Sequence, residues 1–93
     1  MTPAKLIHDL VSSLGLKVRD ATFQDSVTQA LLRYRKDRLF YTFVILKNSM
    51  EVKGWRFERL DDHHGLQDDR YVAQLISNLH DPDSIEKIKN FVL

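Results

Sequence analysis

The sequence predicts an α+β domain in which helices flank a central antiparallel sheet. Three observations predict this class: apolar residues follow a helical period near the N-terminus, an aromatic and β-branched run stands at the centre, and a helical period returns in the C-terminal third. The expected order is an N-terminal helix, a three-stranded antiparallel meander with a possible short fourth strand, and two C-terminal helices. The 93 residues (1–93) are expected to form a single domain.

The first helix is predicted from Pro3 to Leu14. Thr2 is a favourable N-cap, and Pro3 suits the first helical position because its missing N–H has no partner there. Gly15 stands where a left-handed residue commonly ends a helix. The apolar stripe of this helix comprises Leu6, Ile7, Leu10, Val11 and Leu14.

The next segments are less regular. Leu16–Arg19 is expected to be a short strand or a connector, and Asp20–Ser26 a loop. Val27–Arg35 fits either a helix or a strand, and the strand is preferred because Lys36-Asp37 can turn it directly into the next apolar run.

Leu39–Lys47 is predicted to be the central strand because it is apolar on both faces. Asn48-Ser49 is expected to form a two-residue turn into a partner strand, Met50–Leu60. Asp61–Gln67 is then a polar loop.

Two helices are predicted after that loop. Asp68 or Asp69 would cap the first, and Asp81-Pro82 would open the second. Their apolar stripes are Tyr71, Val72, Leu75, Ile76 and Leu79, and then Ile85, Ile88 and Phe91 or Val92.

The net charge of +1 conceals an uneven distribution along the chain. Residues 1–32 are neutral, residues 33–59 carry eight basic against three acidic side chains, and residues 60–93 carry three basic against seven acidic ones. A basic centre of this kind can mark a nucleic-acid surface, or it can neutralise the acidic block within the fold. The absence of cysteine excludes disulfides, thiolate metal sites and a thiol nucleophile.

Alternation along the predicted strands divides their side chains between two faces. The core face would carry Thr28, Ala30, Leu32, Tyr34, Leu39, Tyr41, Phe43, Ile45, Val52 and Gly54. The opposite face would carry a basic and aromatic set, extended by Val27, Leu31, Val44 and Leu46, with Glu51 as its only acid. That candidate binding set is Arg33, Arg35, Arg38, Phe40, Lys53, Trp55, Phe57 and Arg59.

This basic-aromatic face predicts a small non-catalytic binding or regulatory module. Arginine and lysine can follow phosphates while aromatic rings stack on bases, which suits single-stranded nucleic acid. The same residue types are enriched at protein interfaces, so a partner protein fits equally. A homodimer through this face is a further possibility, and a covering helix would instead make the face part of the core.

The enzyme alternative rests on Glu51-Val52-Lys53 with Asp37 upstream. These residues resemble the core of the PD-(D/E)xK nucleases, which implies that Asp37 and Glu51 bind a divalent metal and that Lys53 activates water. Lys36 replaces the proline of that family's motif. A tight hairpin would also place Asp37 and Glu51 at opposite ends, roughly 30 Å apart.

Two further patterns concern metals and topology. Asp61, Asp62, His63 and His64 form an acidic, histidine-bearing loop that could hold a transition metal, although a solvated loop followed by a helix cap explains it as well. The predicted αβββα order resembles the double-stranded-RNA-binding domain, but Asp68-Asp69-Arg70 stands where that family has a lysine-rich helix start.

No cofactor is expected, because the three glycines are too far apart for a phosphate-binding loop and no G-x-S-x-G motif occurs. The N-terminus has no signal-peptide pattern, and the longest apolar run, Leu39–Leu46, is too short to span a bilayer. A cytoplasmic protein without membrane partners is therefore expected.

Overall fold

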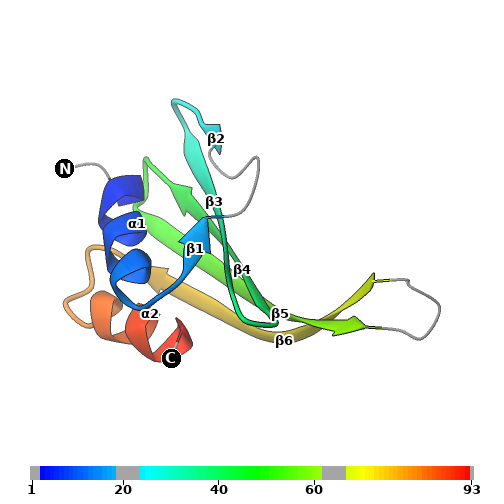
Figure 1. The fold of residues 1–93 in the computed structure, drawn as a ribbon. Coiled ribbons are helices and arrows are strands. Elements are labelled where there is room, and N and C mark those ends of the chain that lie inside the picture. The colour runs from blue at the N-terminus through cyan, green and yellow to red at the C-terminus, as the bar shows by residue number, and fades with distance from the viewer. Residues whose placement is uncertain (1–2, 19–23, 62–66, 93) are drawn as a thin grey trace.

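The computed structural model describes residues 3–18, 24–61 and 67–92. It is an α+β structure in which one helix precedes and one helix follows the strands of an antiparallel sheet along the chain (Figure 1). The elements are α1 (Pro3–Ser13), β1 (Lys17–Val18), β2 (Gln24–Asp25), β3 (Gln29–Lys36), β4 (Leu39–Leu46), β5 (Glu51–Asp61), β6 (Gln67–Asn78) and α2 (Ser84–Val92).

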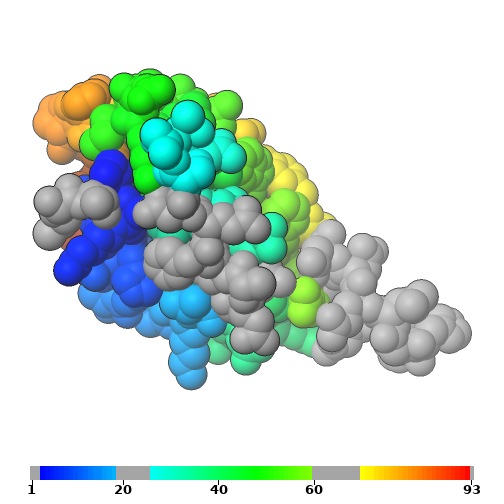
Figure 2. Space-filling view, turned by 90° about the horizontal axis from the view of Figure 1, so that it is seen from above, coloured from blue at the N-terminus to red at the C-terminus, as the bar shows by residue number. Residues whose placement is uncertain are grey.

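The sheet is built on the meander β3-β4-β5-β6, and the short strands β1 and β2 both pair with β3 on its other side. Every pairing is antiparallel. The structure measures 45 × 26 × 20 Å, and its long axis follows the paired strands β5 and β6, which extend past the end of β4 (Figures 1 and 2).

The strand prediction for residues 27–35 is confirmed from Gln29 onward, whereas Val27 and Thr28 form a bend before the strand. The register of the central hairpin agrees with the sequence. Leu46 pairs with Glu51 as expected, across a four-residue turn that ends at Met50, whose φ is 61°. The turn between β3 and β4 is Asp37–Arg38 and not Lys36–Asp37, because Lys36 pairs with Leu39. That correction moves the pairing by two residues, so each side chain keeps its predicted face.

The first of the two predicted C-terminal helices is wrong. Residues 67–78 form β6, which pairs with β5 over eleven positions, so the sheet has a long fourth meander strand. Tyr71, Val72, Leu75 and Ile76 have helical spacing, yet their β-branched and aromatic character also suits a strand. Pairing with the exposed side of β5 decided between them, and the αβββα order is therefore absent.

A β-bulge explains why strand alternation was hard to see in residues 71–76. Arg56 pairs with Ala73 and Phe57 pairs with Tyr71, so Val72 is an extra residue on β6. The extra residue shifts the period-2 pattern by one position.

The two helices lie on the same side of the sheet (Figure 1). On that side α1 contributes Ile7 and Val11 and α2 contributes Ile88 and Val92, all four with at most 1% of their surface exposed. The sheet side chains beneath them include Leu32, Tyr34, Tyr41, Phe43, Ile45 and Val52. The predicted core face is therefore confirmed for these residues.

Glycine is required at two positions of this core side. Gly15 has φ +92° and ends α1 as predicted, with the Leu16 N–H donating to the Val11 carbonyl and the Gly15 N–H to the Ser12 carbonyl. At Gly54 a Cβ atom would lie 3.1 Å from the Phe43 ring and 3.2 Å from the Phe91 ring. The glycine thereby lets α2 approach β5 closely.

Candidate binding surface

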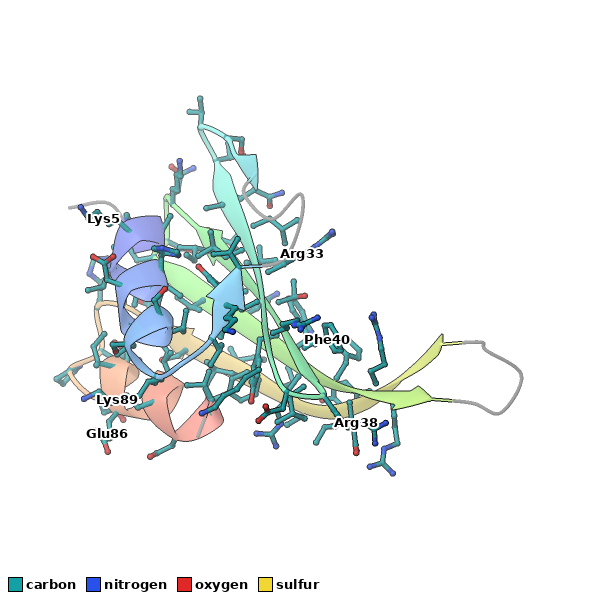
Figure 3. The ribbon with its side chains drawn as sticks, in the orientation of Figure 1. Lys5, Arg33, Arg38, Phe40, Glu86 and Lys89 are labelled. Atoms are coloured by element: carbon teal, nitrogen blue, oxygen red, sulfur yellow. The ribbon has the colours of Figure 1, made fainter. Side chains whose placement is uncertain are left out.

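The side of the sheet away from the helices, termed the outer face, carries the predicted basic-aromatic residues. Figure 3 shows Arg33 and Phe40 pointing to this side, opposite α1 and α2. The strand pairing places residues of β3, β4, β5 and β6 side by side in four rows across it. These rows are Arg35–Phe40–Phe57–Tyr71, Arg33–Thr42–Trp55–Gln74, Leu31–Val44–Lys53–Ile76 and Gln29–Leu46–Glu51–Asn78.

The first two rows form an aromatic half. Trp55 and Phe57 are partly buried, and the Phe57 ring meets the Tyr71 ring edge-on with centroids 6.1 Å apart. Tyr71 is the most accessible of these rings, with 55% of its surface exposed. This half presents aromatic surface beside the guanidinium groups of Arg33 and Arg35.

Phe40 differs from the other rings of the outer face because it is covered. Only 5% of its surface is exposed, and the Arg59 guanidinium lies over its ring with Cζ 4.0 Å from the centroid. This is cation–π geometry, which holds Arg59 on the outer face. Phe40 and Arg59, both predicted binding residues, therefore form one positively charged part of the outer face.

The other two rows form an aliphatic half. Leu31, Val44 and Leu46 are partly buried, and Ile76 is 61% exposed. The charges in this half neutralise each other, since Lys53 Nζ lies 3.6 Å from Glu51 Oε1. The outer face is thus apolar through its middle, with the guanidinium groups of Arg33 and Arg35 at the β3 side.

Sequence reasoning missed the contribution of β6 to this surface. Tyr71, Gln74 and Ile76 lie on the outer face, whereas a helix over the same residues would have removed them from the sheet. A test for period-2 alternation that allows one bulge would have found them, because Gln74 and Ile76 alternate with the inward-facing Leu75 and Ser77.

Arg38 is separate from the rows. It is exposed in the turn between β3 and β4, where its carbonyl accepts a hydrogen bond from the Arg59 N–H at 2.9 Å. This bond ties the turn to β5, so Arg38 stands at the rim of the aromatic half.

Arg56, which was not predicted to bind a partner, faces the helices. Its Nη1 donates to the Phe91 carbonyl at 2.9 Å, and its guanidinium lies 5.7 Å from the Phe91 ring centroid. Burial raises the pKa of Tyr41 above its ordinary value, and the nearby Arg56 partly offsets that rise. Arg56 therefore anchors α2 to β5, which is a structural role.

The structure does not bring the residues of the nuclease alternative together. Asp37 lies in the turn before β4, and Glu51 pairs with Leu46 at the far end of that strand. The length of β4 separates them by about 23 Å, whereas a divalent cation holds its oxygen ligands within about 2.6 Å. Glu51 and Lys53 instead form an ion pair on the outer face.

The alternative metal site lies mostly outside the described residues. That applies to Asp62, His63 and His64 and to the side chain of Asp61. Within residues 3–18, 24–61 and 67–92, no group of three histidine or acidic residues is arranged to hold a metal ion.

Comparison with protein-family models, with curated proteins and with solved structures found no match. Neither described helix is long and apolar enough to cross a membrane.

Proposed function

We propose that this protein is a small non-catalytic binding module whose outer face docks a partner protein. The observation that carries the proposal is the apolar middle of that face, which lies on the side of the sheet opposite both described helices. An antiparallel sheet with one face in water normally alternates apolar and polar residues so that the outer face is polar. Contiguous apolar surface on such a face favours an interaction site.

The residue types favour a protein as the partner. Tryptophan, tyrosine, phenylalanine and arginine are the types most enriched at interface centres. The aliphatic half matches apolar side chains through Val44 and Ile76, and the charge of its Lys53 is paired with Glu51. Arg33 and Arg35 at the β3 side would then meet carboxylates at the rim of the partner.

Single-stranded nucleic acid is the second candidate, supported by the basic block of residues 33–59. Stacking on bases needs accessible ring faces. Phe40 is covered by Arg59, and Tyr71 is the most exposed ring of the aromatic half in the part of the chain that the structure describes. Because Phe40 is covered and Trp55 and Phe57 are partly buried, the aromatic half offers few open ring faces for stacking, which favours the protein partner.

The proposal is tested by affinity capture from the native host, followed by calorimetry with each purified partner. We expect Trp55→Ala to weaken binding by about tenfold or more, because truncating an aromatic side chain at the centre of an interface has an effect of this size. Arg35→Glu should also weaken it, because Arg35 is exposed on the outer face. Lys5→Glu is the matched control, since it makes the same charge reversal at an exposed position of α1, on the opposite side of the sheet, and should leave binding unchanged (Figure 3).

Circular dichroism must first show that each variant is folded. If Trp55→Ala does not fold, Arg35→Glu still tests whether the outer face binds the partner. Equal binding by wild type, Trp55→Ala and Arg35→Glu would refute the outer face as the docking site. Binding that nuclease treatment abolishes, and that falls steeply with salt, would refute the protein partner in favour of nucleic acid.

A further inference from the structure

The two edges of the sheet are built differently. At the β3 edge, β1 pairs at Tyr34 and Arg35, and β2 pairs at Ala30 and Leu31. Short strands of this kind are a common way to protect a sheet edge against pairing with other chains. At the opposite edge, β6 is twelve residues long and pairs only with β5 among the described strands.

The exposed edge of β6 has one common protective feature, the bulge at Val72, and lacks the others from Tyr71 onward. Residues 71–78 contain no charge, no proline and no glycine. Tyr71, Val72 and Ile76 are 55%, 39% and 61% exposed, so three of the eight side chains in residues 71–78 are apolar and exposed. An uncharged run of this length at a sheet edge is a template for addition of another strand.

We infer that this edge is a dimer interface, in which β6 pairs antiparallel with β6 of a second copy of this chain. An identical strand matches residues 71–78 in length and polarity, and it places no like charges opposite each other. A strongly charged partner strand would find no complementary charge there. Tyr71, Gln74 and Ile76 also belong to the outer face, but the inference concerns the backbone edge of β6, so it does not rest on the proposed function.

Antiparallel pairing of identical strands has two-fold symmetry, which closes the assembly at two copies. The strands β1 and β2 at the other edge prevent that edge from extending the sheet further. The dimer would therefore be a discrete particle with one sheet running through both copies. Edge pairing alone buries less than the roughly 1,200–2,000 Å² of stable interfaces, so a dissociation constant in the micromolar range is expected.

Sedimentation velocity on the full chain, from about 5 to about 500 µM, tests the dimer because this range brackets the expected constant. Wild type should change from monomer to dimer across the series. Gln74→Lys adds a charge at an exposed position near the middle of the uncharged run, so two copies would oppose like charges. We expect the dissociation constant of this variant to rise at least tenfold.

Gln29→Lys is the matched control, because Gln29 is an exposed strand residue on the protected side of the sheet. It should dimerise as wild type does. A chain that remains monomeric throughout the series would overturn the inference, and so would a dimer that Gln74→Lys and Gln29→Lys affect equally.

Cross-linking gives a second test that does not depend on like-charge repulsion. The chain has no cysteine, so a single introduced one reports only its own position. Val72→Cys, Gln74→Cys and Ile76→Cys probe the middle of the edge, and the position nearest the two-fold axis should form a disulfide dimer fastest, since the Cα atoms must approach to about 4.4–6.8 Å. Cross-linking no faster than that of Gln29→Cys would contradict β6 pairing.

Discussion

Tyr34 is a completely buried residue that retains a polar group. Its hydroxyl lies 3.0 Å from His8 Nδ1, which accepts the hydroxyl hydrogen when that nitrogen is unprotonated. Burial raises the pKa of Tyr34 well above its ordinary value, and the nearby Asp9 carboxylate adds to the rise. The neutral phenol is therefore part of the folded core.

A raised folded-state pKa gives Tyr34 a defined effect on stability. Its contribution is complete below the unfolded-state pKa of about 10 and is lost as pH rises toward the folded-state value. The loss is about 1.4 kcal/mol per pH unit, because the unfolded chain ionises first.

We expect Tyr34→Phe to be less stable than wild type at pH 8 by about 1 kcal/mol, since one hydrogen bond is removed. Above about pH 10 this deficit should shrink and then reverse, because phenylalanine does not ionise. Urea unfolding at pH 8 and about pH 11.5 measures both values. A deficit that stays constant with pH would show that Tyr34 does not titrate against folding.

The end of α1 shows how one residue closes an element. Gly15 has φ +92°, and two hydrogen bonds to Val11 and Ser12 complete the helix terminus. Lys36 adds a third bond, because its Nζ donates to the Leu14 carbonyl at 3.1 Å. These bonds fix the exit of the chain toward β1.

Gly15→Ala is expected to destabilise the protein by about 1 kcal/mol, because an L-residue is strained in this conformation. A Cβ at Gly15 would be 3.7 Å from the nearest atom of Lys36, so the cost comes from the backbone and not from a clash. The melting temperature should fall by about 4–8 °C. Gly15→Asn, which tolerates positive φ better, should cost less, and an unchanged melting temperature for Gly15→Ala would contradict this explanation.

At the scale of the whole molecule, both described helices cover one side of one sheet (Figure 1). The C-terminal helix α2 supplies Ile88 and Val92 to the core and places the Phe91 ring against Tyr41 and Phe43. Full burial of an aliphatic or aromatic side chain contributes about 1.5–3 kcal/mol, so Ile88 and Val92, together with the partly buried Phe91, contribute about 4–5 kcal/mol. That is comparable with the total stability of a small domain.

A chain that ends at Asp83 is therefore expected not to fold cooperatively. Near-UV circular dichroism should be lost, and urea should give no sigmoidal transition. The double substitution Glu86→Ala and Asn90→Ala, on the exposed side of α2, is the control and should preserve the transition. A truncated chain with the wild-type urea midpoint would contradict the role of α2 in the core.

The limits of sequence reasoning are clearest in residues 67–78. The stripe of Tyr71, Val72, Leu75 and Ile76 satisfies a helical period, and the bulge at Val72 interrupts the strand period. The choice between helix and strand depended on whether β5 had a free side to pair with. That information lies in residues distant along the chain.

Local chemistry by itself determined α1, its end at Gly15, the strands β4 and β5 and the division of their side chains between two faces, and it favoured a strand over a helix for β3. These features follow from short-range periodicity and turn residues, which act within a few positions of the chain. Only the tertiary structure decided that residues 67–78 join the sheet, that Asp37 and Glu51 stand far apart, and that β6 forms an edge. The reason is physical: strand pairing and helix packing satisfy hydrogen bonds and bury surface between distant segments, so they can override a local helical preference.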